Sequence, residues 1–235
     1  MVGLGPGNEA LLTPQAAKAL QEANVVVGYS TYIRLIQPLL TEQTVLSSGM
    51  KKEIDRAKAA VSTALQGKHV VVISSGDPGV YGMAGLVLEV APATLPVTVV
   101  PGVTAATSAA AVLGAPLVHD FAVISLSDLL TPWQTIQTRL AAAASADFVI
   151  VLYNPRSRGR QEHLRQAQEI MLTYRSGSTP VGFVKNIGRS GESSVISTLA
   201  ELSVEQVDMT TTVIVGNSQT KVVHGKMVTP RGYTV

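Results

Sequence analysis

Residues 70–82 constrain the fold more than any other stretch of the chain. Residues 70–73 (VVVI) form a continuous β-branched apolar run, which predicts a strand buried on both faces of a parallel sheet. Turn residues follow at 74–76, and Asp77-Pro78 then predicts the N-cap and first turn of a helix over about 79–90. A strand that leads through a glycine turn into a helix start is a common ligand site in open α/β sheets. An ordinary turn without a ligand fits the same pattern equally well.

Predicted helices and strands alternate along the rest of the chain. The predicted helices cover residues 14–23, 29–40, 53–66, 103–111, 132–144 and a segment ending near 174. The further predicted strands cover residues 1–4, 25–27, 97–100, 121–126, 147–152, 181–186, 193–198 and 211–215, with a hairpin over 221–229. Thr13-Pro14 and Thr131-Pro132 each predict an N-cap followed by the first helical residue.

These elements predict an α/β protein of two domains, 1–115 and 116–235, separated by a linker over 113–120. The spacing of the strands makes the first domain more parallel and the second mixed. A length of 235 residues is enough for two such domains with substantial cores.

The glycine-rich segment at residues 3–7 (GLGPG) invites comparison with a dinucleotide-binding loop. Its spacing is G-x-G-x-G, whereas the dinucleotide fingerprint is G-x-G-x-x-G, and Pro6 stiffens the turn. The strand at 25–27 ends in Gly28-Tyr29-Ser30, without an acidic residue to hold a ribose. The sequence therefore argues against classical NAD binding, and a plain strand-to-helix turn remains an alternative.

Composition excludes several classes of protein. The hydrophobic fraction of 46% and the charged fraction of 14% indicate a compact chain rather than a disordered one. The absence of cysteine excludes disulfides, thiolate metal sites and cysteine nucleophiles in this sequence. No apolar run reaches membrane-spanning length, and the first residues lack signal-peptide character, so we expect a cytoplasmic protein with no membrane partner. The net charge of +2 does not indicate nucleic acid as a partner.

No classical catalytic or metal-binding constellation is present in the sequence. The four histidines, at 69, 119, 163 and 224, lack ligand spacing, so we expect no metal. Neither a G-x-S-x-G elbow nor a G-x-x-x-x-G-K-[ST] loop occurs. What remains is a set of strand ends that carry glycine and small polar residues. This pattern favours a cofactor held by main-chain contacts, with catalysis by positioning.

Four segments, in the expected order along nearly the whole chain, together resemble the tetrapyrrole methylases. They are residues 3–7 (GLGPG), 75–82 (SGDPGVYG), 101–105 (PGVTA) and 212–216 (TVIVG). The resemblance implies S-adenosylmethionine as cofactor, S-adenosylhomocysteine as product, and a trough between two α/β domains as the active site. It also implies a homodimer.

Three further segments are similar to the branch of that family that methylates C17 of a corrin precursor: residues 49–53 (GMKKE), 124–133 (ISLSDLLTPW) and 152–157 (LYNPRS). That branch acts on precorrin-3B or cobalt-factor III in cobalamin biosynthesis, and methylation accompanies contraction of the ring. The implied substrate is an acidic tetrapyrrole. The sequence leaves open whether it contains cobalt.

The resemblance carries over to individual residues. It implies that the cofactor contacts Pro6, Ser75, Gly76, Asp77, Val80, Thr104, Ala105, Tyr153, Asn154, Asn186, Thr211 and Thr212. For the substrate it favours Gly5, Met50 and Arg156, since a guanidinium fork fits a carboxylate. Asp128, Ser125 and Tyr29 are the candidate catalytic groups for proton movement. Arg158, Arg160 and Arg165 are expected to be surface charges.

Three alternatives remain at this point. The chain could act on another tetrapyrrole, or it could be a relative of ribosomal RNA 2′-O-methyltransferases, with the arginines at 156–165 as a phosphate patch. A non-enzymatic ligand-binding module is the third. The small net charge and the 4% aromatic content argue against RNA. Detection of a methylated product after incubation with cofactor and substrate would distinguish an enzyme from a ligand-binding module.

Overall fold

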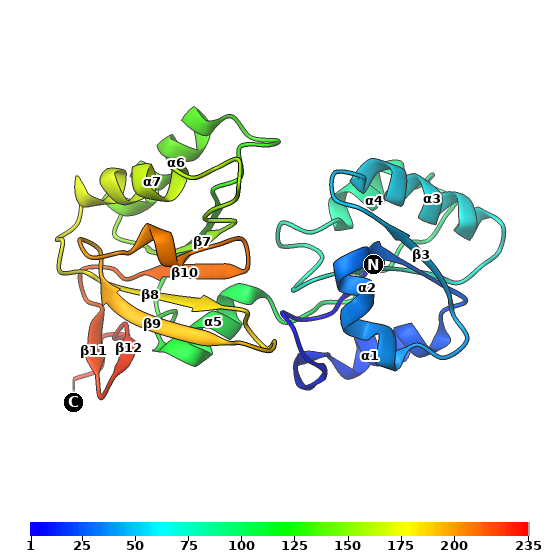
Figure 1. Ribbon diagram of the computed structural model, residues 1–235, viewed down its shortest axis with the longest axis horizontal. Coiled ribbons are helices and arrows are strands. Elements are labelled where there is room, and N and C mark those ends of the chain that lie inside the picture. The colour runs from blue at the N-terminus through cyan, green and yellow to red at the C-terminus, as the bar shows by residue number, and fades with distance from the viewer. Residues whose placement is uncertain (235) are drawn as a thin grey trace. The chain divides into compact units, whose positions relative to one another are not determined.

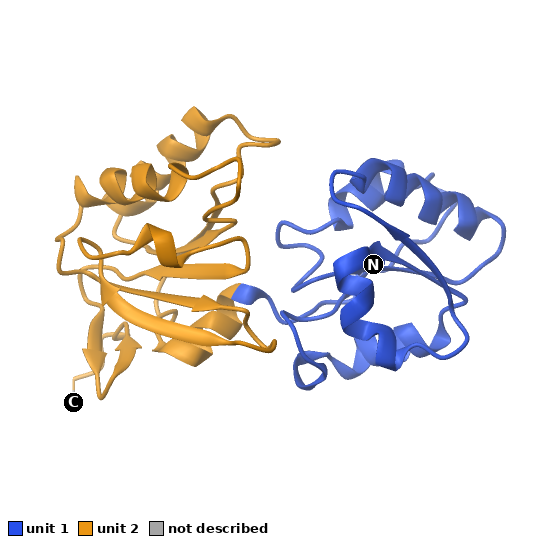
Figure 2. Ribbon diagram, in the orientation of Figure 1, with its two compact units in different colours: residues 1–105 blue, residues 106–235 orange. Residues whose placement is uncertain are grey.

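The computed structural model describes residues 1–234 and divides the chain into two compact units (Figure 2). Unit 1 is Met1–Ala105, and unit 2 begins at Ala106. The division falls at the first residue of helix α5 (Ala105–Leu113), so this helix belongs almost wholly to unit 2. The boundary predicted after residue 115 lies at the other end of the same helix. Both units combine helices with a sheet, which confirms the predicted α/β class (Figure 1).

Unit 1 is built on a parallel sheet with the order β1-β4-β2-β3. Its strands are β1 (Val2–Gly3), β2 (Val25–Tyr29), β3 (Thr44–Ser48) and β4 (Val70–Ser74). Its helices are α1 (Pro14–Glu22), α2 (Ser30–Ile36), α3 (Glu53–Leu65) and α4 (Ala84–Val90), with short 3₁₀ turns at Glu9–Leu11 and Gln37–Leu39. Strand β3 was not predicted, because its residues are largely exposed at the edge of the sheet.

Helices cover both faces of this sheet because successive residues of β2 and β4 point to opposite sides. Val26 and Val71 pack with α1 and α2, whereas Val25, Val27 and Val72 pack with α3 and α4 (Figure 1). Strands buried on both faces read as continuous apolar runs, which is why the sequence predicted β2 and β4 correctly.

The helix starts were predicted with mixed success. Thr13 caps α1 as expected, and its Oγ1 accepts a hydrogen bond of 3.1 Å from the Ala16 N–H. The expected cap at Asp77 was wrong, because α4 begins at Ala84 and residues 78–83 form turns instead. Tyr81 in this segment has a left-handed backbone (φ 53°), which no helix accommodates.

The strand predicted over residues 97–100 was also wrong. Only Val100 makes a bridge, with Val2. Strand β1 is two residues long, so it offers too short a partner for a longer ladder.

Unit 2 contains a mixed sheet with the order β6-β7-β10-β8-β9, in which only β6 and β7 are parallel. Its strands are β6 (Phe121–Ser125), β7 (Val149–Tyr153), β8 (Pro180–Lys185), β9 (Ser193–Thr198) and β10 (Thr211–Val215). A smaller sheet joins β11 (Lys221–Val223) and β12 (Lys226–Val228) to β5 (Gly114–Ala115), which lies inside the predicted linker. The predicted parallel first sheet and mixed second sheet are confirmed.

Helices α6 (Trp133–Ser145) and α7 (His163–Leu172) cover one face of the mixed sheet, where the main core of unit 2 lies (Figure 1). A 3₁₀ turn, Val204–Gln206, adds to this core. On the other face, Leu113 of α5 packs directly over Gly182. Thr131 does not cap α6 as predicted. Pro132 occupies the cap position with an extended backbone (ψ 138°), and the cap has no side-chain hydrogen bond.

Three glycines bring the backbones of three loops together in unit 1. A Cβ atom on Gly3 would lie 2.6 Å from the nitrogen of Gly102 and 2.7 Å from the oxygen of Gly76. A Cβ on Gly102 would lie 2.8 Å from the Cα of Gly3. No side chain fits at these distances, so glycine at these positions allows residues 3–7, 74–79 and 100–105 to touch.

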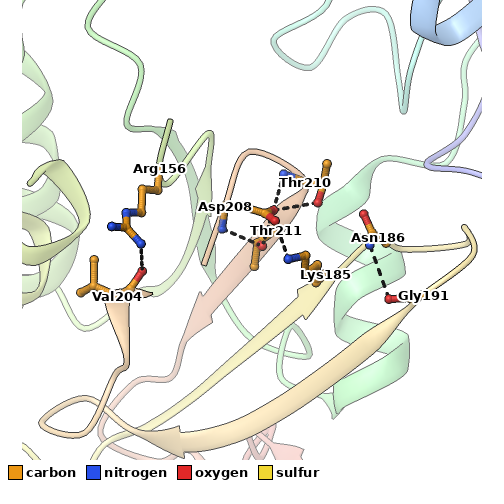
Figure 3. A network of polar contacts seen from close by, with 8 residues as sticks. All are labelled: Arg156, Lys185, Asn186, Gly191, Val204, Asp208, Thr210 and Thr211. Carbon is orange, nitrogen blue, oxygen red and sulfur yellow. Dashed lines mark hydrogen bonds and ion pairs between the residues drawn. The ribbon is translucent and has the colours of Figure 1, made fainter. Parts of the chain in front are cut away.

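In unit 2, Asp208 ties the segment before β10 to β8 (Figure 3). Its Oδ2 lies 2.5 Å from Nζ of Lys185, and its Oδ1 accepts hydrogen bonds from Thr210 N–H (2.9 Å) and from the hydroxyls of Thr210 (2.7 Å) and Thr211 (3.1 Å). Burial alone would raise the pKa of Asp208. The contacts with Lys185, Thr210 and Thr211 outweigh burial and lower the pKa to about 2.

We predict that Gly102→Ala destabilises the protein by about 1–3 kcal/mol, because the added methyl group overlaps the backbone of Gly3. Thermal unfolding followed by circular dichroism measures the effect. Gly85→Ala on α4 is the control, since no atom lies within 4 Å of its added methyl group. The control should keep or raise stability. An unchanged melting temperature for Gly102→Ala would contradict the close approach of the loops.

The depressed pKa of Asp208 also predicts a pH dependence. The stabilisation is complete above the ordinary pKa of 3.8 and is lost as pH falls through about 2. We expect Asp208→Asn to lower the free energy of unfolding by on the order of 1 kcal/mol at pH 7, after discounting for partial exposure, and by progressively less between pH 4 and pH 2. Urea unfolding across this range measures it. Asp55→Asn, which removes an exposed carboxylate paired with Lys52, is the control and should change the free energy of unfolding at pH 7 by well under about 1 kcal/mol.

Candidate functional site

The candidate residues of unit 1 follow the carboxyl ends of its parallel strands. This is the edge at which open α/β sheets bind ligands. Gly5 and Pro6 follow β1, Tyr29 ends β2, and Met50 follows β3. The remaining ones follow β4 or the bridge at Val100: Ser75, Gly76, Asp77, Val80, Thr104 and Ala105.

The segments after β1 and β4 are joined by direct main-chain contacts. Gly5 and Gly76 form a bridge, with N–H to carbonyl distances of 3.1 Å and 2.7 Å. Both glycines have left-handed backbones (φ 71° and 65°). Thr104 and Ala105 lie against the same turn, because their backbone atoms are 3.8 Å from the position a Cβ on Gly76 would take. These four residues and the half-buried Ser75 form one cluster.

Asp77 holds this cluster together rather than capping a helix. Its Oδ1 accepts a hydrogen bond from the Gly79 N–H (2.7 Å), and its Oδ2 accepts one from the Gly102 N–H (3.0 Å). The Val80 N–H also donates to the carbonyl of Asp77 (3.3 Å). One carboxylate therefore connects the turn after β4 to the loop that leads to Thr104.

Tyr29 and Met50 belong to the other side of this edge, where β2 pairs with β3. The ring of Tyr29 packs edge-on against Tyr32, with centroids 5.2 Å apart, and Met50 is 64% exposed. The charged residues of 51–58 suggest a solvated helix face, but Arg56 of α3 is buried beside this loop. It donates to Ser48 Oγ and to the carbonyl of Gly49, both at 3.0 Å.

The candidate residues of unit 2 likewise gather at one edge of its sheet. Ser125 of β6 pairs in register with Tyr153 of β7, and Thr211 of β10 pairs with Lys185 of β8. Because β10 runs antiparallel to β7 and β8, its amino end lies beside their carboxyl ends. Sheet topology thus places the ends of four strands on the same edge.

Side-chain hydrogen bonds fix the β6 and β7 ends of this edge. Ser125 Oγ accepts from Asn154 Nδ2 (2.9 Å) and from the Ser127 N–H (3.2 Å). The hydroxyl oxygen of Tyr153 accepts a hydrogen bond of 2.7 Å from the Ala106 N–H. Asn154 has a left-handed backbone (φ 50°), which turns the chain sharply after β7.

At the β8 and β10 ends, Asn186 also has a left-handed backbone (φ 52°), and its amide donates to the carbonyl of Gly191 (3.4 Å; Figure 3). Thr211 and Thr212 are buried, 3% and 5% exposed. Arg156 donates to the carbonyl of Val204 at 3.1 Å (Figure 3), so its side chain is anchored within unit 2.

Asp128 lies in the segment after β6, with its Oδ2 3.1 Å from Nε2 of His163. Burial alone would raise the pKa of Asp128, but the interactions with His163 and Arg160 lower it below its ordinary value. Asp128 was predicted as a site residue but His163 was not, because 34 intervening residues separate two groups that the β6–β7 pairing brings together. Arg160, expected to be a surface charge, is partly buried and donates to Ser127 Oγ (3.2 Å).

Two cavities lie near these elements, one in each unit. A cavity of about 60 Å³ in unit 1 is lined by Leu4, Gly5, Gly7, Asn8, Glu9, Leu12, Leu35, Ile36, Pro38 and Leu39. It is far smaller than the sites that hold drug-sized ligands. One of about 310 Å³ in unit 2 is lined by residues that include His119, Phe148 and Asn217, which precede β6 and β7 and follow β10. It therefore lies at the sheet edge opposite Ser125 and Tyr153.

Two further observations concern residues 1–234. No group of three or more acidic or histidine side chains there could hold a metal ion. None of the helices in the same range is long and apolar enough to span a bilayer.

Comparison with known proteins gives a consistent result. The family model described as "Tetrapyrrole (Corrin/Porphyrin) Methylases" matches residues 1–203. The chain is 51% identical to a "Probable cobalt-factor III C(17)-methyltransferase" of Salmonella typhimurium, over 100% of this chain and 99% of the relative. It is 41% identical to a "Precorrin-3B C(17)-methyltransferase" of Sinorhizobium sp, over 95% and 90% of the two chains. A "Cobalt-factor III methyltransferase" of Priestia megaterium is 48% identical over 99% of this chain, which spans only 44% of that longer relative.

Solved structures show the same similarity. The crystal structure of the methyltransferase CobJ matches with a TM-score of 0.93 and 38% identity, over 97% of this chain and 98% of that one. Uroporphyrin-III C-methyltransferase from Thermus thermophilus, complexed with S-adenosyl homocysteine, matches with a TM-score of 0.69 and 26% identity, over 92% of this chain and 95% of that one. From its sequence, its fold and the family model that spans most of its length, the chain belongs to the tetrapyrrole (corrin/porphyrin) methylases.

Proposed function

We propose that this methyltransferase uses S-adenosylmethionine to methylate a corrin precursor at C17, with contraction of the ring, in cobalamin biosynthesis. The observation that carries the proposal is the 51% identity, over essentially the full length of both chains, to a relative named for this reaction on cobalt-factor III. The relative named for precorrin-3B is 41% identical, so we propose cobalt-factor III as the preferred substrate.

The candidate cofactor residues fit S-adenosylmethionine by their chemistry. Among them, only Asp77 carries a charge, and no lysine or arginine is present to neutralise phosphates. Unit 1 offers small residues on loops that the glycine contacts hold together, and unit 2 offers Tyr153, Asn154, Asn186, Thr211 and Thr212. Such a set suits a nucleoside with a zwitterionic amino-acid tail better than a dinucleotide. One solved relative of this fold binds S-adenosyl homocysteine.

S-Adenosylmethionine supplies, when bound, a methyl group on a sulfonium centre that is already activated for transfer to carbon. The residues of this chain then need mainly to hold the reactants in position, which is worth roughly 7–11 kcal/mol of the barrier in well-oriented reactions. The tight contacts among Gly3, Gly76 and Gly102 suit that task, because a rigid backbone loses little entropy when a ligand binds.

Proton movement during ring contraction falls to polar groups at the same edges. Asp128 is the first candidate. Its lowered pKa makes it a weaker base than an ordinary carboxylate but keeps it ionised at neutral pH, so it can accept a hydrogen bond from the group that transfers the proton. Ser125 holds the neighbouring Asn154 amide and can relay a proton through its hydroxyl group. Tyr29, at the end of β2, is the third candidate.

Substrate binding is assigned to Arg156, Met50 and Gly5. The contact between Arg156 and the carbonyl of Val204 orients a guanidinium that has five N–H donors, a geometry suited to a carboxylate of the macrocycle. The exposed Met50 offers an apolar, adaptable contact for a flat ring. We also propose that the enzyme is a cytoplasmic homodimer. Sedimentation of the purified protein tests the oligomeric state.

We predict that the enzyme adds one methyl group to cobalt-factor III and releases one equivalent of S-adenosylhomocysteine. Mass spectrometry of reactions with the cobalt-containing and metal-free substrates, side by side, measures this. A ribosomal RNA substrate is the control and should remain unmodified. Faster turnover of precorrin-3B would reverse the substrate preference. Methylated RNA with unchanged corrinoids would contradict the proposal altogether.

We predict that Asp77→Ala raises the Kd for S-adenosylhomocysteine by at least tenfold, or about 1.4 kcal/mol, because the loops on either side of Gly76 lose their shared acceptor. Isothermal titration calorimetry measures the Kd. Asp55→Ala, which removes an exposed carboxylate from the same unit, should bind normally. If Asp77→Ala binds within twofold of the parent enzyme, the placement of the cofactor at this cluster is wrong.

A further inference from the structure

The start of α7 carries a partly buried histidine that the proposed mechanism does not use. His163 is the first residue of this helix, and its side chain is 17% exposed. Its Nε2 lies 3.1 Å from Asp128 Oδ2, and neither ring nitrogen has a well-aligned hydrogen bond within the described part of the chain. The attachment of His163 to its surroundings is therefore the ion-pair contact with Asp128 together with ring packing.

The imidazole ring of His163 also packs against an aromatic side chain of α6. Its ring packs against Trp133, with centroids 4.2 Å apart. The indole N–H of Trp133 donates to Gln166 Oε1 at 2.7 Å, so α7 also holds the first residue of α6. The imidazole thus lies at the junction of α6, α7 and the segment that joins β6 to α6.

That joining segment, residues 126–132, has few apolar contacts of its own towards its tip. Leu129 is 61% exposed and Leu130 is 93% exposed. The start of the segment is held by the buried Leu126, whose N–H donates to the carbonyl of Tyr153 (2.9 Å), and by the Ser127 N–H, which donates to Ser125 Oγ (3.2 Å). Nearer the tip, the side-chain contacts are the one from Asp128 to His163 and the hydrogen bond that Ser127 Oγ accepts from Arg160 (3.2 Å). Because hydrophobic burial does not anchor the tip, these contacts determine where Asp128 lies.

A contact between partly exposed polar groups adds little net stability, and the Asp128 side chain is 39% exposed. What the contact with His163 adds is a defined position for the two side chains. At this site the group positioned is Asp128, which lies three residues after Ser125 in the same segment.

We propose that His163 is a positioning residue for methyl transfer with ring contraction. It holds Asp128, and with it the segment over 126–132, so that the Asp128 carboxylate and the Ser125 hydroxyl keep fixed places at the sheet edge. This inference rests on the proposed function, because the reaction is what requires these two groups to be in place.

Limited proteolysis tests the positioning without reference to activity. Chymotrypsin cleaves after leucine, and Leu129 and Leu130 are exposed at the tip of the segment. We expect His163→Leu and Asp128→Asn to raise the cleavage rate at these two bonds at least fivefold. His163→Gln, which keeps a donor at the place of Nε2, should stay near the parent rate. His119→Gln is the matched control, since His119 forms an exposed pair with Asp120 in the same unit.

Steady-state kinetics with the corrinoid substrate tests the functional part. We expect His163→Leu to lower kcat about tenfold with the KM for S-adenosylmethionine unchanged, His163→Gln to restore most of kcat, and His119→Gln to match the parent. Unchanged cleavage or unchanged kcat in both His163 variants would overturn the positioning role while leaving the proposed function intact. A parent enzyme that does not methylate any corrinoid would overturn the proposed function, and the positioning role with it.

Discussion

The close approach of three backbones at Gly3, Gly76 and Gly102 is the constraint on which unit 1 depends. A parallel sheet brings the ends of its strands to one edge but leaves the following loops free to diverge. The glycines remove the side chains that would separate these loops, and Asp77 then ties two of them through the N–H groups of Gly79 and Gly102. The result is a set of loops joined by main-chain contacts and one carboxylate at the edge of the sheet where open α/β folds bind ligands.

Unit 2 reaches a comparable edge by different means. Side chains, rather than close backbone contacts, fix its strand ends. Ser125 accepts a hydrogen bond from Asn154, and Asp128 contacts His163. Asp208 forms an ion pair with Lys185 and accepts a hydrogen bond from Thr211. Several of these contacts involve the carboxylates of Asp128 and Asp208, whose protonation depends on pH. Unit 1 thus fixes its strand ends mainly through close backbone contacts, and unit 2 does so mainly through side-chain contacts.

The sequence predicted those features that local patterns determine. Buried strands such as β4 appear as apolar runs, and Thr13-Pro14 marked the start of α1 correctly. Prediction from the sequence failed where tertiary contacts compete with local signals. Asp77-Pro78 resembles a helix start, but the carboxylate of Asp77 is used by Gly102, which is 25 residues away. The pairing of Asp128 with His163 could not be found either, since it depends on the register of β6 and β7.

The central claim is that the glycine-joined loops of unit 1 and the strand ends of unit 2 bind the methyl donor. Hydrogen–deuterium exchange with and without S-adenosylhomocysteine tests it most directly. The account predicts slower exchange on binding at residues 74–80, 101–106, 153–154, 186–187 and 211–212. Protection confined to residues 119–120, 146–148 and 217–219, which line the larger cavity at the opposite edge of the sheet, would contradict it.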